Sequence, residues 1–239
     1  MDNIKFFRVL WRVNAIIILV LTIITLIILI GTNFFENRAP YQKRSVYLDY
    51  ENVPEEESER KARWYLDEFK EINDFGMFAV QLISEQSFSI GFSKTKKTEA
   101  IRNYLFVDTN KNNSFWLFEQ NDFVISELQY VTTKDRISHS FYSDDEIIAL
   151  FFVVYKVDTN KDNAIKDNDL GAVVLTKPDG SAYTEIEKEI ENIRSIKVTN
   201  GGKDLILFYE KEGKQYVSKY SLIEFKKISE MEINTNGKF

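Results

Sequence analysis

Oxygen-bearing side chains recur at alternate positions in one loop of this sequence. Asp158, Asn160 and Asp162 take the first, third and fifth places of a twelve-residue stretch, and Asp169 takes the twelfth. An EF-hand-type loop uses this spacing to direct ligands to one Ca²⁺, with a backbone carbonyl at the seventh place, here Ala164. The sequence therefore predicts a calcium site made of Asp158, Asn160, Asp162, Ala164 and Asp169.

Three positions of this loop depart from the usual calcium pattern. Asn163 stands at the sixth place, where glycine is usual, and asparagine also accepts a left-handed backbone. Lys166 at the ninth place cannot bind a cation, so water would fill that place. Asp169 is shorter than the usual glutamate, so either it binds through one oxygen or Asp167 takes its role. We expect weak affinity, and the alternative is a solvated turn that binds nothing.

An echo of this loop begins at Asp108, about 50 residues earlier. Asp108, Asn110, Asn112 and Glu119 match the first, third, fifth and twelfth places. The apolar run 115–118 predicts a strand, however, and a strand there would carry Glu119 away from the loop. We interpret this segment as a hairpin turn that holds no ion.

Catalytic signals are sparse. His139 is the only histidine and there is no cysteine, so a zinc hydrolase site and a cysteine nucleophile are excluded. Serines flank His139, but no Gly-x-Ser-x-Gly turn accompanies it. A hydrolase that uses paired carboxylates stays open, because a sequence cannot pair its 37 acidic residues in space. The sequence therefore favours a protein that is not an enzyme.

An uncharged apolar run covers Ala15–Ile30. With its flanks it reaches the length of a membrane-spanning helix, about 17–25 residues. We predict a transmembrane helix at 13–32, a cytoplasmic tail at 1–12, a linker at 33–44 and an extracytoplasmic β-rich domain at 45–239. Arg8 and Arg12 at the membrane edge favour this orientation. The alternative is a cleaved signal peptide, but no small-residue cleavage motif follows the run.

The charge of the chain restricts its partners. The whole chain has a net charge of −6, and its first twelve residues contain three bases and one acid, so the remainder carries −8. A surface of this sign disfavours nucleic acid and suits divalent cations.

Beyond the linker the sequence is mostly β in character. One helix is expected at 55–73, because the apolar residues of this stretch fall near the spacing of a core-facing stripe: Trp64, Tyr65, Leu66, Phe69 and Ile72. A partner-binding helix is the alternative. The remaining segments alternate apolar and polar residues. They predict strands at 45–50, 78–83, 88–92, 104–107, 115–118, 123–125, 147–157, 172–175, 196–198, 205–209, 216–222, 225–228 and 231–233.

These strands recur with a period of about 50 residues, since Val107, Val157 and Phe208 each lie where a strand gives way to a loop or turn. Four short strands per period are typical of β-propeller blades. Only about four such units fit in 45–239. We therefore expect either a β-propeller-like domain or an open meander or sandwich of hairpins covered by the 55–73 helix.

The stretch 176–185, which contains Pro178-Asp179-Gly180-Ser181, resembles the strand-turn-strand of TolB-like and WD40-like bacterial propeller repeats. With the Asp158 loop and one N-terminal span, the chain is similar to uncharacterised single-pass envelope proteins of Gram-negative bacteria. The resemblance covers about 150–185 well. It implies a location in the bacterial inner membrane and an architecture of repeats, and it implies no activity.

Together these features predict a membrane-anchored periplasmic module with one weakly bound Ca²⁺. Its expected role is to present a β surface to an envelope protein or polymer. A calcium-responsive transmembrane regulator is the alternative, although the tail 1–12 is short for a signalling part. A carboxylate-based hydrolase is a third hypothesis.

Overall fold

The computed structural model describes residues 45–48, 62–73, 76–90, 94–140 and 144–234, together with eight positions between Trp11 and Thr25. Contacts divide the chain into two compact units, Met1–Gln42 and Lys43–Phe239. Each unit is considered by itself.

The described positions of the first unit are helical. The hydroxyls of Thr22 and Thr25 donate to the carbonyls of Ile18 and Leu21, both at 2.8 Å, which is the i−4 bonding of serine and threonine in helices. Among the residues described, no helix reaches the length and apolar character of a membrane span. Most of the span predicted at 13–32 and the whole linker predicted at 33–44 lie outside the described residues.

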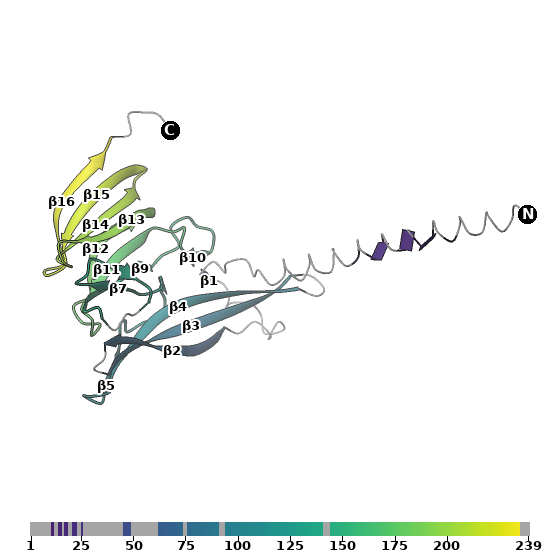
Figure 1. Cartoon of the computed structure of the whole chain (residues 1–239), viewed down its shortest axis with the longest axis horizontal. Coiled ribbons are helices and arrows are strands. Elements are labelled where there is room, and N and C mark those ends of the chain that lie inside the picture. Colours follow the sequence, from purple (N-terminus) through teal and green to yellow (C-terminus); the bar gives the residue numbers. More distant parts are fainter. Residues whose placement is uncertain are drawn as a thin grey trace, which may run out of the picture. The chain divides into compact units, whose positions relative to one another are not determined.

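The second unit is mostly β, as the sequence predicts (Figure 1). Its largest sheet has ten strands in the order β12-β11-β9-β6-β4-β3-β2, with β5 beside β4, and with β7 pairing both β8 and β9. Their bounds are β2 Arg63–Asn73, β3 Met77–Ile90, β4 Lys94–Asp108, β5 Asn113–Trp116, β6 Val124–Ile125, β7 Gln129–Thr132, β8 Ile137–Ser138, β9 Ile147–Tyr155, β11 Gly171–Thr176 and β12 Thr184–Ile190.

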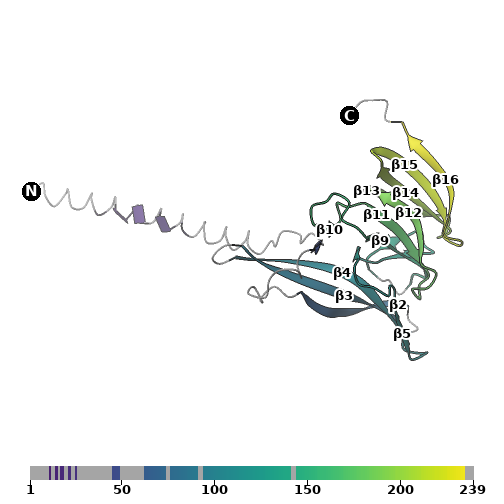
Figure 2. The ribbon, with the colours of Figure 1, turned by 180° about the vertical axis from the view of Figure 1, so that it is seen from behind.

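Two smaller sheets complete the described part of the unit. A four-stranded antiparallel meander lies beside β9, β11 and β12 (Figure 2), and consists of β13 Asn192–Thr199, β14 Asp204–Lys211, β15 Lys214–Ser221 and β16 Lys226–Ile233. The short strands β1 Ser45–Tyr47 and β10 Ala164–Lys166 pair antiparallel with each other. Since β10 lies inside the predicted calcium loop, β1 is attached directly to that loop.

Strand β9 separates two hydrophobic cores. Its sequence is an almost unbroken apolar run, which is typical of a strand covered on both faces. Because side chains alternate along a strand, Phe151 and Val153 face the core shared with the four-stranded sheet, while Phe152 and Val154 face the core shared with β4. The second unit is therefore a layered β structure with β9 at its centre.

The helix predicted at 55–73 is wrong for its described part. Residues 63–73 form strand β2, an end strand of the ten-stranded sheet, and 55–61 lie outside the described residues. The pairing of β2 with β3 shifts register between Leu66 and Phe69, and such a bulge adds a residue to the period of two. The apolar residues thus acquired a helical spacing within a strand. Trp64, Leu66 and Phe69 are also exposed, so they form no core-facing stripe.

The predicted repeats do not form separate blades. Strands β4 and β9, from the first two periods, belong to one sheet, and only the third period forms a four-stranded sheet of its own. The strands predicted at 78–83 and 88–92 correspond to one continuous strand, β3, as far as Ile90. In the described residues no closed propeller is present, so the open, layered alternative is nearer to the observed architecture.

Candidate calcium loop and adjoining pocket

The loop predicted to bind Ca²⁺ connects the two central strands, β9 and β11. Ala164 and Ile165, at the seventh and eighth places, are buried, and they pair with Tyr47 and Val46 of β1. The amide of Leu48 also donates to the carbonyl of Asn163 at 3.1 Å. The apolar side chain of Ile165 therefore anchors the loop to β1.

The first half of the loop is folded around its own side chains. The amide of Asp162 donates to Asp158 Oδ1 at 3.2 Å and to Asn160 Oδ1 at 2.9 Å, so these oxygens converge on one N–H group. The amide of Asn163 donates to Asp158 Oδ2 at 2.8 Å. Asn163 has φ = 65°, the left-handed conformation expected at the sixth place.

Asp169 closes the loop from its twelfth place. Its side chain is almost fully buried, with 1% of the residue exposed. Oδ1 accepts from the amide of Thr159 at 2.8 Å and from its hydroxyl at 3.0 Å, and Oδ2 accepts from the amide of Lys166 at 2.8 Å. Both oxygens of Asp169 are thus engaged by the loop itself.

Lys166 occupies the position where a cation would be attracted. Its ammonium donates to Asp162 Oδ2 at 2.8 Å and lies 5.4 Å from the ring centroid of Tyr47. The hydrogen bond to Lys166 lowers the pKa of Asp162, and the same bond raises the pKa of Lys166. In the described part of the chain, no three acidic, histidine or cysteine side chains converge as a metal cluster.

The loop thus fits Ca²⁺ in its oxygen donors and in its backbone conformation. It does not fit in two respects, since the oxygens of Asp169 already have donors and Lys166 neutralises Asp162. An ion at Asp158, Asn160 and Asp162, with the carbonyl of Ala164, would have to displace the Lys166 ammonium.

The echo at Asp108 is a hairpin turn between β4 and β5, with Asp108 paired to Asn113. Asp108 Oδ1 accepts from the amides of Asn110 and Lys111, at 3.1 and 3.0 Å, and the Lys111 ammonium lies 3.0 Å from Oδ2. These bonds lower the pKa of Asp108, with the backbone amide of Lys111 contributing most. The strand at 113–116 directs the chain out of the turn before Glu119, as the sequence predicts.

His139 takes no part in a serine–histidine pair among the contacts described. Its Nδ1 lies 3.3 Å from the carbonyl of Leu128 and 4.0 Å from Glu127 Oε2. The hydroxyl of Ser138 accepts from the amide of Ser140 instead.

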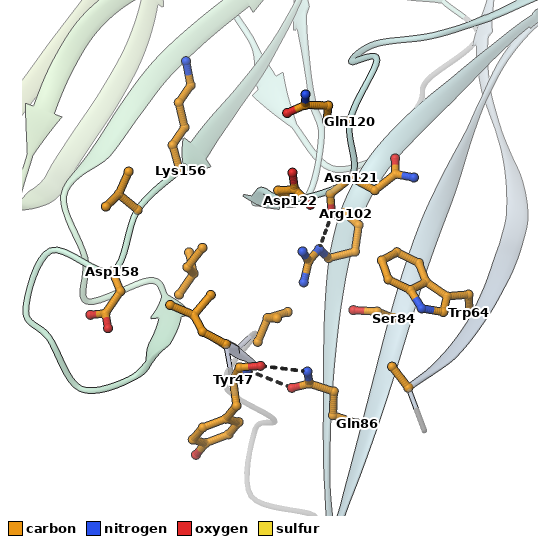
Figure 3. A pocket seen from close by; sticks show the side chains of 15 residues that line it. Tyr47, Trp64, Ser84, Gln86, Arg102, Gln120, Asn121, Asp122, Lys156 and Asp158 are labelled. Carbon is orange, nitrogen blue, oxygen red and sulfur yellow. Dashed lines mark hydrogen bonds between the residues drawn. The ribbon is translucent and has the colours of Figure 1, made fainter. Parts of the chain in front are cut away.

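Sequence reasoning missed a cavity of about 900 Å³ beside the loop (Figure 3). Seven separated segments line it: β1 with Leu48, the start of β2 with Ala62, β3, β4, the loop 120–122, the stretch 156–158 after β9, and Ile165 of β10. In Figure 3 the hydroxyl of Ser84 and the guanidinium of Arg102 point toward the side from which Asp158 comes. The signal that the sequence offers is the aromatic content of 63–73, but the spacing of these residues predicts a helix.

Comparisons with known proteins identify no relatives by sequence. No family model and no curated protein matches the chain. Among solved structures, the beta-propeller domain of the Trilobed protease from Pyrococcus furiosus is similar at 10% identity and a TM-score of 0.35. The match covers 74% of this chain and 45% of that one. A similarity of this size establishes neither the fold nor the function of this chain.

Proposed function

We propose that this chain is a membrane-anchored, extracytoplasmic calcium-binding β module of the bacterial cell envelope. Its role is interaction or structure, and it is not an enzyme. The observation that carries the proposal is the conformation of the Asp158–Asp169 loop. Asp158 and Asn160 converge on the amide of Asp162, and Asn163 has the left-handed conformation that a calcium loop requires at its sixth place.

Calcium stabilises the loop by replacing an internal cation. The Lys166 ammonium now neutralises Asp162, and Ca²⁺ competes with it for that carboxylate. Competition of this kind, and the engagement of Asp169 by backbone amides, predict weak affinity, on the order of 10⁻⁴–10⁻³ M as in extracellular modules. Such a site is filled where calcium is abundant, outside the cytoplasm.

An interaction role is supported by the exposed face of β2. Trp64, Leu66 and Phe69 are 43%, 51% and 67% exposed on an end strand of the largest sheet. Apolar side chains gathered in this way are typical of contact surfaces. The partner is an envelope protein or polymer, since the acidic surface disfavours nucleic acid. Membrane attachment is supported by the apolar run Ala15–Ile30.

Thermal unfolding of the full-length protein tests the calcium site. A ligand that binds only the folded state stabilises it by RT ln(1 + [L]/Kd), about 1.4 kcal/mol at tenfold excess over Kd. The melting temperature should therefore rise by a few degrees in millimolar calcium relative to chelator, at constant ionic strength. Asp158→Ala should abolish this gain, whereas Asp108→Ala should retain it.

The competing lysine gives a sharper test. Lys166→Gln removes the cation from Asp162, so it should increase the calcium-dependent rise in melting temperature. Lys161→Gln is the matched control, because Lys161 lies in the same loop, is exposed and has no ion pair among the described residues. Equal melting temperatures with calcium and chelator in the parent and in Lys166→Gln would show that the loop is only a turn.

Location is tested separately. The chain lacks cysteine, so Glu224→Cys introduces a single thiol at an exposed turn. A membrane-impermeant maleimide should label it in cells whose outer membrane has been opened. Labelling only after lysis of the inner membrane would place the domain in the cytoplasm.

A further inference from the structure

The wall of the cavity beside the candidate calcium loop includes a buried hydroxyl that has no partner in the described part of the chain. Ser84 is 2% exposed, and its hydroxyl has no hydrogen-bond partner among the described residues. Buried hydroxyls are ordinarily paired, because leaving water without a new partner is unfavourable. The hydroxyl lies on the wall of the cavity (Figure 3). A ligand in the cavity is therefore the available source of its missing hydrogen bond.

The indole ring of Trp64 belongs to the residue that pairs with Ser84 across β2 and β3. The guanidinium of Arg102 lies 5.5 Å from the ring centroid of Trp64, and Arg102 Nε donates to the carbonyl of Asn121 at 2.9 Å. These contacts hold the guanidinium beside the indole, and the Trp64 residue is still 43% exposed. An amphipathic indole in a mixed cavity suits a ligand that has both apolar C–H surface and polar groups.

Two further polar side chains of the lining supply hydrogen-bond donors and acceptors between them. Gln120 and Asp122 are exposed at the rim and have no partner among the residues described. The amide of Gln120 offers donors and an acceptor, and the carboxylate of Asp122 offers acceptors. Ligand hydroxyl groups, which donate and accept together, match this set.

The charged side chains that line the cavity have a net charge of zero, with two cations and two anions. Arg102 and Lys156 are cationic, and Asp122 and Asp158 are anionic. Lys156 is in addition paired with Glu185. The cavity thus has no excess of positive charge with which to attract a phosphate or a carboxylate, and a neutral ligand is favoured.

We infer that this cavity binds a neutral oligosaccharide. Sugar rings supply C–H faces for Trp64, and their hydroxyls pair with Ser84, Gln120 and Asp122. The volume of about 900 Å³ is within the range of small-ligand sites, roughly 300–1,000 Å³. This inference goes beyond the proposed function and does not require that the loop bind an ion.

The test uses the full-length protein in a detergent without a sugar headgroup. Short neutral oligomers of glucose, mannose, galactose and N-acetylglucosamine are titrated into the protein, and binding is measured by calorimetry. Inorganic phosphate and an oligomer of galacturonic acid serve as anionic probes. Saturable binding of at least one neutral oligomer is expected. Binding of none at millimolar concentrations, or binding of the anionic probes alone, would overturn the inference.

Two tryptophans of equal exposure locate the site. Trp64→Ala should weaken binding of the neutral oligomer about tenfold or more, equivalent to about 1.4 kcal/mol. Trp116→Ala is the control, because Trp116 is also 43% exposed but lies on β5 outside the cavity. Equal effects of the two variants would place the sugar elsewhere and overturn the inference.

A second variant protects the test against misfolding. Gln120→Ala changes an exposed side chain that has no partner within the described ranges, so the melting temperature of the variant should equal that of the parent, while its affinity for the oligomer falls. Unchanged affinity in both Gln120→Ala and Trp64→Ala would exclude the cavity. The calcium-dependent rise in melting temperature is measured independently, so failure of sugar binding is distinguishable from failure of the calcium site.

Discussion

The side-chain amide of Gln86 forms hydrogen bonds with both the backbone N–H and the backbone carbonyl of Tyr47. Gln86 Oε1 accepts from the Tyr47 amide at 2.9 Å, and Gln86 Nε2 donates to the Tyr47 carbonyl at 3.1 Å. Gln86 is buried on β3, whereas Tyr47 pairs with Ala164 in the candidate calcium loop. This amide therefore connects the largest sheet to the loop through β1.

Replacing Gln86 by leucine should detach β1. The variant leaves an amide and a carbonyl of Tyr47 without these partners, and a buried unsatisfied group costs about 1–3 kcal/mol. We expect lower stability in urea and faster hydrogen exchange at 45–48. Gln120→Leu is the control, and should change the free energy of unfolding by no more than about 0.5 kcal/mol. Unchanged exchange at 45–48 in Gln86→Leu would contradict this connection.

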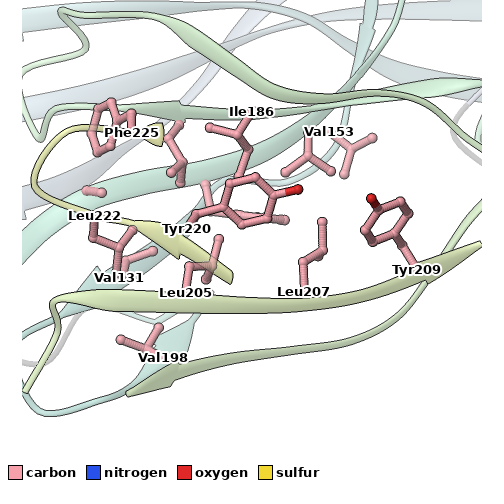
Figure 4. Packing of buried hydrophobic residues seen from close by; sticks show 14 of the residues in the cluster. Val131, Val153, Ile186, Val198, Leu205, Leu207, Tyr209, Tyr220, Leu222 and Phe225 are labelled. Carbon is pink, nitrogen blue, oxygen red and sulfur yellow. The ribbon is translucent and has the colours of Figure 1, made fainter. Parts of the chain in front are cut away.

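A second polar network joins the ten-stranded sheet to the four-stranded sheet. The Lys227 ammonium on β16 pairs with Glu187 on β12 and with Glu230. Glu230 Oε2 accepts from the hydroxyl of Tyr209 at 2.7 Å. Figure 4 shows that the hydroxyls of Tyr209 and Tyr220 point toward each other at one side of the core. Burial raises the pKa of Tyr209 to about 12, so this phenol stays protonated and donates.

Lys227→Met should destabilise the protein because it leaves Glu187 nearly buried without its cation. Removing one partner of a buried pair costs about 3–5 kcal/mol, and we expect the lower end because the Lys227 side chain is one-third exposed. Lys226→Met is the matched control. Lys226 pairs with Glu224 on the surface, and exposed pairs contribute about 0–1 kcal/mol. Equal losses in urea denaturation would show that the network does not join the sheets.

The same network predicts a pH dependence. Hydrogen bonds from Lys227 and Tyr209 lower the pKa of Glu230 in the folded state. A carboxyl with a depressed folded pKa stabilises the protein above its unfolded pKa, and this contribution disappears as pH falls through the folded value. The melting temperature should therefore decrease on acidification from about pH 5 to pH 3, and less steeply in Lys227→Met.

Part of the pH dependence of the melting temperature should remain in Lys227→Met because of Glu185. Burial alone raises the pKa of Glu185, but hydrogen bonds from Lys156 and Tyr183 lower it overall. The slope in Lys227→Met should thus be reduced and not abolished, whereas Lys226→Met should keep the slope of the parent. Identical slopes in all three proteins would contradict the assignment to Glu230.

Local features of the fold were predictable because they depend on nearby residues. The left-handed backbone at Asn163 follows from its place in the loop, and φ is 65° there. The turn at Pro178-Asp179-Gly180 is present, with the amide of Gly180 donating to the carbonyl of Lys177 at 2.9 Å. The hairpin at Asp108 was likewise predictable from the strand residues that follow it.

Features that depend on distant pairing were not predictable. The spacing of Leu66 and Phe69 indicates a helix until the bulge against β3 is known. The polar stretch 84–87 indicates a strand end, yet β3 continues through it because β4 supplies every partner. The cavity is assembled from seven segments, so no single stretch of sequence carries its pattern. In each case the register with another strand determines the outcome.

Two glycines in turns allow the cost of backbone strain to be distinguished from the cost of overpacking. Gly180 and Gly213 have similar φ values, 79° and 68°. A Cβ on Gly180 would lie 2.5 Å from the ring of Phe106, which is fully buried on β4, whereas a Cβ on Gly213 would meet no atom within 4 Å. The 177–181 turn is therefore packed directly against the ring of Phe106.

Gly213→Ala should thus lower the free energy of unfolding only by the cost of placing an alanine in the left-handed backbone conformation, about 1–2 kcal/mol. Gly180→Ala should cost this amount and a further overpacking term of about 1–3 kcal/mol, because the ring of Phe106 has to move within a packed core. Urea denaturation of both variants measures the difference. Phe106→Leu should reduce the additional cost of Gly180→Ala, since contacting residues couple in a double-mutant cycle, and should leave the cost of Gly213→Ala unchanged. Equal costs for the two glycines would mean that the turn does not pack on Phe106.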